Sequence, residues 1–94
     1  MDAVIRRYAG PGARELFAFL EKSATDVQVL MRNIDGFVSY TLARTEEGGF
    51  SVTVFLNKKG IDESLAKARE WVAKNAAHIG PIEEPEVIWG KVIG

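Results

Sequence analysis

The stretch FVSYTLARTEEGGFSVTVFL, from Phe37 to Leu56, reads as two β-strands joined by a glycine turn. Its halves are rich in the β-branched and aromatic residues that suit a pleated sheet. Successive strand side chains point to opposite faces, so Val38, Tyr40 and Leu42 share one face of the first strand. Gly48 and Gly49 supply the turn. We therefore predict a β-hairpin, and the remaining segments can be understood as the elements that cover it.

The two faces of the predicted hairpin differ in character. One carries large apolar side chains, including the row Phe50, Val52, Val54 and Leu56 of the second strand. The other face carries mostly small side chains, both polar and apolar. Neither face suits open water, so we expect both to be covered, although two helices cover only one. The second face is expected to carry Ser39, Thr41, Ala43, Ser51, Thr53 and Phe55.

The flanking segments predict two further strands and two helices. Apolar residues at steps of three and four indicate one helix from about Ala13 to Asn33 and another from Asp62 to Ile79. Strands are expected from Ala3 to Tyr8 and from Val87 to Ile93. The order βαββαβ predicts a ferredoxin-like α+β fold, with a four-stranded antiparallel sheet and two helices on one face. We expect residues 1–94 to form one domain.

Composition and charge argue against several partners. The chain has 12 Lys and Arg against 13 Asp and Glu, a net charge of -1, so it lacks the electrostatic signature of a nucleic-acid or anionic-membrane binder. The segment Gly48 to Phe55 partly overlays the third-strand signature of RNA-recognition motifs. However, Val52 replaces its second stacking aromatic, and Ile5 stands where the first strand would need a ring. RNA binding is therefore disfavoured.

The chain lacks cysteine, a membrane-spanning apolar run and a signal peptide, and these absences restrict its expected chemistry and cellular location. The chain has no cysteine, which excludes disulfides, thiolate nucleophiles and cysteine-based metal sites. No apolar run approaches the ~20 residues needed to span a bilayer. The start MDAVIRRYAG lacks the apolar core of a signal peptide. We expect a cytoplasmic protein without a membrane partner.

Several segments together resemble the dimeric α/β-barrel superfamily, and more narrowly small bacterial proteins related to antibiotic biosynthesis monooxygenases. They are IRRYAG, DGFVSY, GGFSVTVF, KGIDES and EWV, and the resemblance extends over nearly the whole chain. The resemblance implies that two ferredoxin-like protomers pack their sheets together as a homodimer. It also implies a small-molecule pocket between the helices and the sheet of each protomer.

The catalytic branches of that superfamily fit less closely. The monooxygenase branch commonly has a tryptophan near the end of its third strand, where this chain has Phe55 or Leu56. That branch also has a histidine on the next helix, where the Ser64 to Lys67 region stands. The haem-degrading branch uses Asn, Trp and His, but the first strand offers Arg6 and Arg7 where the Asn is wanted. The resemblance thus implies no cofactor, and haem degradation is disfavoured.

Two groups of residues remain candidates for chemistry. His78, the one histidine, and Trp71 are spaced by two helical turns, so they could be catalytic at a pocket rim. The structural alternative, which we favour, is an exposed His78 and a packed Trp71. A lone histidine predicts no metal site. The candidate substrate-binding residues are Arg6, Arg7, Tyr40 and Arg44.

An arginine aimed into a pocket could bind a carboxylate or enolate, and a tyrosine such as Tyr8 or Tyr40 could donate to an oxyanion. The structural alternative, again favoured, pairs Arg6 or Arg7 with an acidic residue among Glu83, Glu84 and Glu86. The sequence therefore favours a homodimeric small-molecule-binding protein without strong catalytic activity. The enzymatic alternative is a cofactor-independent monooxygenase or cyclase acting on a small aromatic or polyketide-like substrate.

Overall fold

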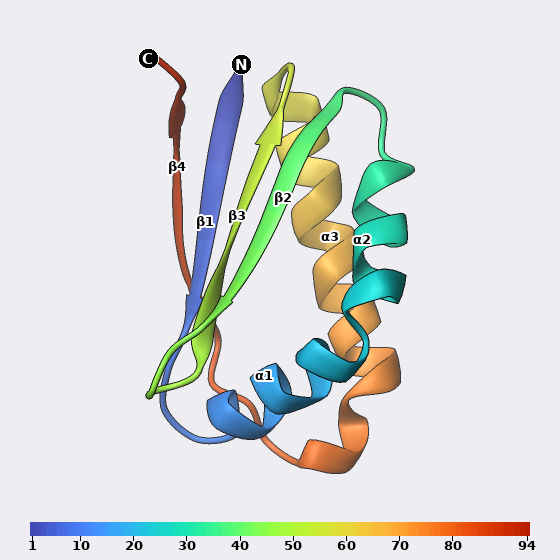
Figure 1. Cartoon of the computed structure of the whole chain (residues 1–94), viewed down its shortest axis with the longest axis vertical. Coiled ribbons are helices and arrows are strands. Elements are labelled where there is room, and N and C mark those ends of the chain that lie inside the picture. Colours follow the sequence, from blue (N-terminus) through green and yellow to red (C-terminus); the bar gives the residue numbers. More distant parts are fainter.

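A computed structural model describes all residues, 1–94, and shows a four-stranded antiparallel sheet with helices on one face (Figure 1). The strand order is β2-β3-β1-β4. This confirms the ferredoxin-like α+β fold predicted from the sequence. In chain order the elements are β1 (Asp2–Tyr8), α1 (Ala13–Lys22), α2 (Ala24–Arg32), β2 (Phe37–Arg44), β3 (Gly49–Phe55), α3 (Lys58–Asn75), the short 3₁₀ helix η1 (Ala77–Ile79) and β4 (Glu86–Lys91).

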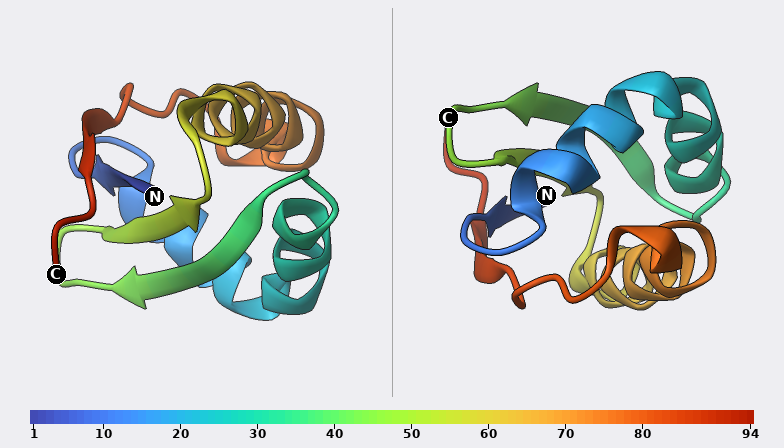
Figure 2. Two further views of the ribbon diagram at one scale, coloured as in Figure 1. Left: turned by 90° about the horizontal axis from the view of Figure 1, so that it is seen from above. Right: turned by 90° about the horizontal axis from the view of Figure 1, so that it is seen from below.

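The first helical region is two helices, so the prediction of one continuous helix was wrong. Ser23 separates α1 from α2, and its backbone N–H donates to the carbonyls of both Phe19 and Leu20. The apolar spacing of three and four continues across Ser23, and for that reason the sequence pattern hides the break. The break lets α1 cross the lower end of the sheet while α2 runs beside the strands (Figures 1 and 2).

The second predicted helix is shifted towards the N-terminus. Asn57 caps α3, with its side-chain oxygen accepting a hydrogen bond from the Gly60 N–H at 3.3 Å, so the start predicted at Asp62 was wrong. The helix ends at Asn75, and His78 lies in η1. The helical spacing assumed between Trp71 and His78 is therefore interrupted.

The register of the β2–β3 hairpin corrects the predicted composition of the sheet faces. The loop 45–48 places Arg44 opposite Gly49, so from Ser39 to Arg44 the even-numbered residues of β2 oppose odd-numbered residues of β3. Tyr40 consequently shares the helix-covered face with Thr53, and Thr41 shares the open face with Val52. The small side chains are divided between the faces, and the apolar row of β3 lies on the side without helices.

The core lies between the sheet and the helices. α2 covers β2, and α3 covers β3 and β1. Two glycines permit the close packing, because a Cβ at Gly49 would collide with the Phe17 ring and one at Gly60 with the Phe55 ring. The buried apolar residues form two clusters, one of Tyr8, Ala13, Leu16, Phe17, Leu20, Val27 and Ala76, and one of Val4, Met31, Ile34, Phe55, Ile61 and Ala68.

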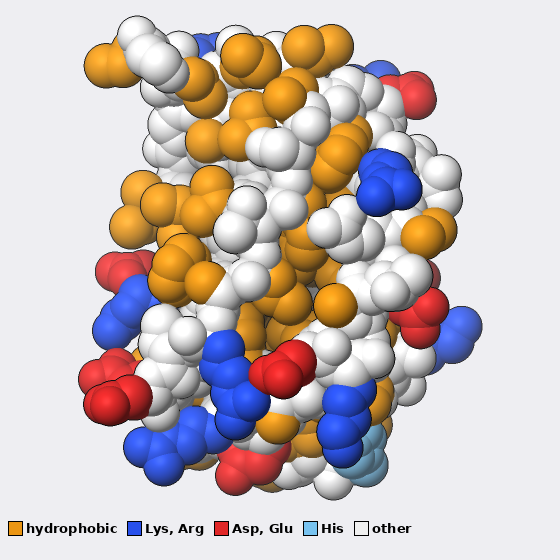
Figure 3. All heavy atoms as spheres, in the orientation of Figure 1, with side chains coloured by type: hydrophobic (Ala, Val, Ile, Leu, Met, Phe, Trp, Pro, Cys, Tyr) orange, Lys and Arg blue, Asp and Glu red, His pale blue; other side chains and the backbone are white.

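The opposite face of the sheet has no helix over it. Ile5, Val52 and Ile88 lie there, and Ile88 is 53% exposed. Figure 3 shows hydrophobic side chains over the upper part of the strands, whereas charged side chains gather at the lower end. None of the helices combines the length and the apolar character that crossing a membrane requires.

Candidate functional site

A cavity of about 130 Å³ opens between α3, β1 and the linker that precedes β4. Apolar side chains supply about half of its lining, and charged side chains supply most of the remainder. The cavity is lined by Arg6, Tyr8, Leu65, Arg69, Val72, Ile82, Glu83, Glu84, Pro85 and Val87.

A second, almost entirely apolar cavity lies deeper, between the sheet and all three α-helices. Its volume of about 10 Å³ is that of a single water position, so side chains fill most of the space under the helices. Arg6, Tyr8 and Val72 line both cavities and form the boundary between them. The inner cavity is also lined by Leu16, Leu20, Val27, Leu30, Met31, Tyr40, Ala68 and Trp71.

Arg6 is the one charged residue common to both cavities. The alternation of β1 points it, with Val4 and Tyr8, towards the helices, and only 8% of it is exposed. Its Nε is buried without a hydrogen-bond partner, and no carboxylate lies within ion-pair distance of its guanidinium. The guanidinium carbon lies 6.0 Å from the centre of the Tyr8 ring. This weak cation–π contact does not replace a hydrogen-bonding partner.

Tyr40 brings a phenol into the same region from β2. Burial raises the pKa of Tyr40 above its ordinary value of 10.0, the positive charge of Arg6 lowers it, and Tyr8 raises it. The phenol is therefore a neutral hydrogen-bond donor near neutral pH. Together with Arg6 it offers donors suited to a negatively charged oxygen.

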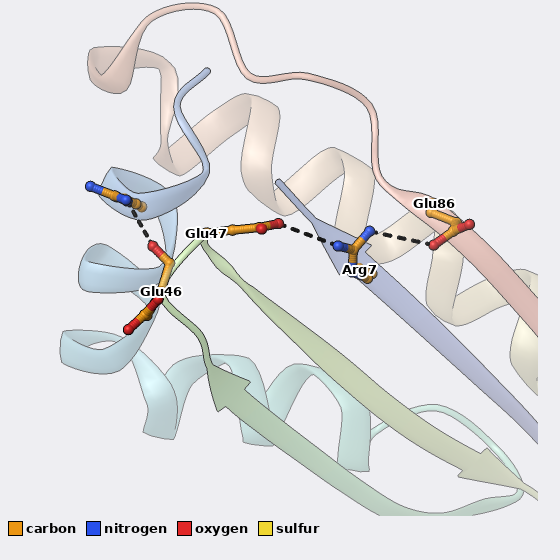
Figure 4. Close-up of polar contacts among 5 residues, drawn as sticks. Arg7, Glu46, Glu47 and Glu86 are labelled. Carbon is orange, nitrogen blue, oxygen red and sulfur yellow. Dashed lines mark hydrogen bonds and ion pairs between the residues drawn. The ribbon is translucent and has the colours of Figure 1, made fainter. Parts of the chain in front are cut away.

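Arg7 points to the other side of the sheet. Its guanidinium lies between Glu47 at 3.3 Å and Glu86 at 3.7 Å, joining the hairpin loop to β4 (Figure 4). All three side chains are more than half exposed, so these pairs contribute little to stability. The structure thus places Arg7 in a surface ion-pair network outside both cavities.

Arg44 and His78 also lie outside the two cavities. Arg44 donates to Glu21 of α1 at 2.8 Å on the surface. His78 is exposed, and its ring meets Phe19 edge to face with centroids 4.9 Å apart. Phe19 in turn packs against Trp71 at 5.7 Å. Of the six residues proposed from the sequence, three line the cavities, namely Arg6, Tyr40 and Trp71. The other three, Arg7, Arg44 and His78, do not.

Several cavity residues were missed by sequence reasoning. Leu65, Arg69 and Val72 follow one another at helical spacing on α3, so their common face could have been found. The contribution of the linker, through Ile82 and Glu83, depends on its path back to the sheet and leaves no such signal. No group of three or more His, Asp or Glu side chains is arranged to hold a metal ion.

Comparison with known proteins identifies the fold. No protein-family profile and no curated protein sequence matches the chain. Among solved structures, a protein of unknown function from Nitrosomonas europaea, NE2512, is 18% identical, with 99% of this chain and 88% of that chain covered and a TM-score of 0.69. SnoaB, a cofactor-independent oxygenase from Streptomyces nogalater, is 17% identical, with 99% and 93% covered and a TM-score of 0.66.

A third solved structure is the monooxygenase ActVA-Orf6 from Streptomyces coelicolor in complex with nanaomycin D. It is 20% identical to this chain, with 99% of this chain and 87% of that chain covered and a TM-score of 0.60. At such identities a likeness concerns the backbone, so the resemblance read from the sequence is confirmed at the level of the fold. The chain therefore has the ferredoxin-like α+β fold that these solved structures share.

Proposed function

We propose that this protein binds a small molecule in the cavity between α3, β1 and the linker, as a homodimer without strong catalytic activity. The observation that carries the binding proposal is the cavity of about 130 Å³, which combines apolar walls with a buried arginine. Binding pockets characteristically place a few polar groups within an apolar lining. The lone histidine stands outside this cavity, and this favours binding over acid–base catalysis.

A thermal-shift screen with aromatic compounds of one to three rings, both neutral and anionic, tests this proposal. We expect a subset to raise the melting temperature in a concentration-dependent manner, because a ligand that binds only the folded state stabilises it. Val72→Trp serves as the matched variant. Val72 lines both cavities, so the indole ring of a tryptophan at this position would occupy part of their space. A screen without any hit on the wild type, or hits that Val72→Trp leaves unchanged, would contradict binding at this cavity.

The homodimer is proposed from the open sheet face. Ile5, Val52 and Ile88 form an apolar area there that no element of the chain covers. A second sheet packed against it would bury this area, and an interface of this kind is self-complementary about a two-fold axis. Sedimentation equilibrium should give twice the chain mass for the wild type. Val52→Lys should give the monomer, whereas a wild-type monomer at micromolar concentration would refute the dimer.

Cofactor-independent oxygenation or cyclisation is the second candidate function. It is favoured by the position of Arg6 beside Tyr40, because both could stabilise an oxyanion that develops on an aromatic substrate. This activity would require turnover of a dihydroxyaromatic or polyketide-like compound, with oxygen uptake for an oxygenation and without it for a cyclisation. Loss of that turnover in Tyr40→Phe, with Arg44→Met unchanged, would support the enzyme. Equal rates in both variants would remove this site from the reaction.

A further inference from the structure

The polar group of the cavity specifies the kind of ligand. We infer that the cavity is an anion site in which the Arg6 guanidinium holds the carboxylate of a one-ring aromatic or similarly sized acid. This inference rests on the proposed binding function and adds to it the ligand's charge and size. It also assigns a different role to each of the two consecutive arginines of β1.

The first step of the argument is the unpaired charge. A buried arginine in a small domain is normally paired, because removal of a cation from water is costly. Arg7, its neighbour, has two carboxylates although it is more than half exposed. Arg6 is 8% exposed and has none, and its Nε lacks any hydrogen-bond partner. A bound carboxylate would provide the partner that the chain itself does not supply.

The second step concerns the surroundings of Arg6. Ser51 lies directly opposite Arg6 on β3, and its Oγ is also buried without a hydrogen-bond partner. Two adjacent buried groups, from two strands, are therefore left with unused hydrogen-bonding capacity. Such unsatisfied groups are rare in folded proteins and require an explanation. A polar group of a ligand at this place would satisfy at least the guanidinium.

The linker carboxylates do not take this role. Glu83 and Glu84 line the cavity, but both are exposed and neither forms an ion pair with Arg6. The Glu83 carboxylate lies over Gly10 in the β1–α1 loop. Arg69, on the same cavity wall, adds a second positive charge that offsets them. An entering anion thus first meets carboxylates at the rim, whose charges water screens. It then reaches the Arg6 guanidinium, which is largely shielded from water.

The third step is the volume. An apolar cavity of about 150 Å³ accommodates one benzene ring. The present cavity of about 130 Å³ is of the same order, and Leu65, Ile82 and Val87 provide apolar walls for a ring. A planar carboxylate can accept two hydrogen bonds from one guanidinium. Single-ring acids fit this space, whereas a three-ring system would have to displace the linker.

Calorimetric titration with benzoate and its neutral isostere benzamide, near neutral pH, tests the inference. We expect the wild type to bind benzoate at least tenfold more tightly than benzamide, and Arg6→Met to lose this preference while its benzamide affinity changes less than twofold. Arg6→Lys should retain part of the preference, because it keeps the charge but not the bidentate geometry. Arg32→Met removes the same charge from the exposed end of α2 and should bind like the wild type.

The outcomes separate this inference from the proposed function. If benzamide and benzoate bind the wild type equally, or if Arg6→Met weakens both alike, the cavity binds ligands but is not an anion site. If no compound of this pair or of the aromatic screen binds the wild type, the binding function itself fails. Circular dichroism of each variant establishes that it is folded, so a loss of affinity is not a loss of structure.

Discussion

Replacement of Arg6 by methionine should make the unliganded protein more stable. The side chain is 8% exposed, and its Nε has no hydrogen-bond partner in the fold. Methionine fills a similar volume without a charge to desolvate. Replacement of buried ion pairs by apolar residues of like volume is neutral or stabilises proteins by about 1–4 kcal/mol, and Arg6 lacks even the attraction of a partner. We expect about 2 kcal/mol for Arg6→Met, towards the lower half of that range because the guanidinium borders the open cavity.

The measurement is urea denaturation followed by circular dichroism, with wild type and variant at equal concentration. Thermal unfolding gives a second readout. A domain of this size gains roughly 4–8 °C in melting temperature per kcal/mol, so a stabilisation of about 2 kcal/mol corresponds to roughly 8–16 °C. Arg32→Met, an exposed arginine on α2, should stay within about 0.5 kcal/mol of the wild type. A destabilisation of about 3 kcal/mol or more by Arg6→Met would refute the reasoning, since a loss of this size is what removal of one partner from a buried ion pair costs.

A ligand should reverse this order of stability. Benzoate at about 100 times its dissociation constant should add about 2.7 kcal/mol to the wild type, because it binds the folded state alone. Arg6→Met should gain much less. The variant would then be the more stable protein without ligand and the equal or less stable one with it. A parallel gain in both proteins would show that Arg6 does not hold the anion.

Three further predictions concern Tyr40, the hairpin and α3. The pKa of Tyr40 is raised above 10.0 in the fold, so its contribution to stability is full below pH 10 and is lost as the pH rises through the folded pKa. Arg6→Met should raise this pKa further, since it removes a charge that lowers it; tyrosinate absorbance in a Tyr8→Phe background measures the shift, and a lowered pKa would contradict it. Gly49→Ala should destabilise the fold by about 1–3 kcal/mol in urea denaturation, because the new Cβ would lie on the Phe17 ring and 2.5 Å from the Ala43 carbonyl oxygen. Asn57→Ala should cost about 1 kcal/mol by loss of the α3 cap, whereas Asn57→Ser should restore most of it; equal stability of all three proteins would show that the cap is not used.

Local patterns were sufficient to predict the order of elements. Strand alternation and the position of the glycines located the hairpin, and the structure forms β2 and β3 within the predicted stretch. The helix break at Ser23 could not be found in this way, because Leu20, Ala24 and Val27 keep helical spacing across it. A change of helix direction without a change of apolar period leaves no trace in a pattern of this kind.

The candidate site was predictable only in part, for a related reason. The alternation of β1 predicts that Arg6 and Arg7 point to opposite faces, and it does not tell which face the helices cover. That choice depends on how β1 pairs with β3, more than 40 residues away in the chain, which sets Arg6 opposite the buried Ser51. The linker walls of the cavity depend on tertiary packing. Arg6, Tyr40 and Trp71 could thus be proposed individually, but their common location could not.

The two consecutive arginines show why the cavity and the open face should be tested separately. Arg6 and Arg7 differ by one position in β1, and this places one beneath α3 and the other on the uncovered side with its two glutamates. The sheet lies between the two features, so a substitution at Val52 on the open face does not touch the lining of either cavity. Val52 pairs with Ile5, the neighbour of Arg6, but the side chains of Val52 and Arg6 point to opposite faces of the sheet. Arg6→Met should therefore change the stability by the same amount, to within about 0.5 kcal/mol, in the wild type and in Val52→Lys, when all the proteins are diluted enough to be monomers. Strong coupling would instead mean that sheet packing determines the shape of the cavity, and the dimer would then be part of the binding site.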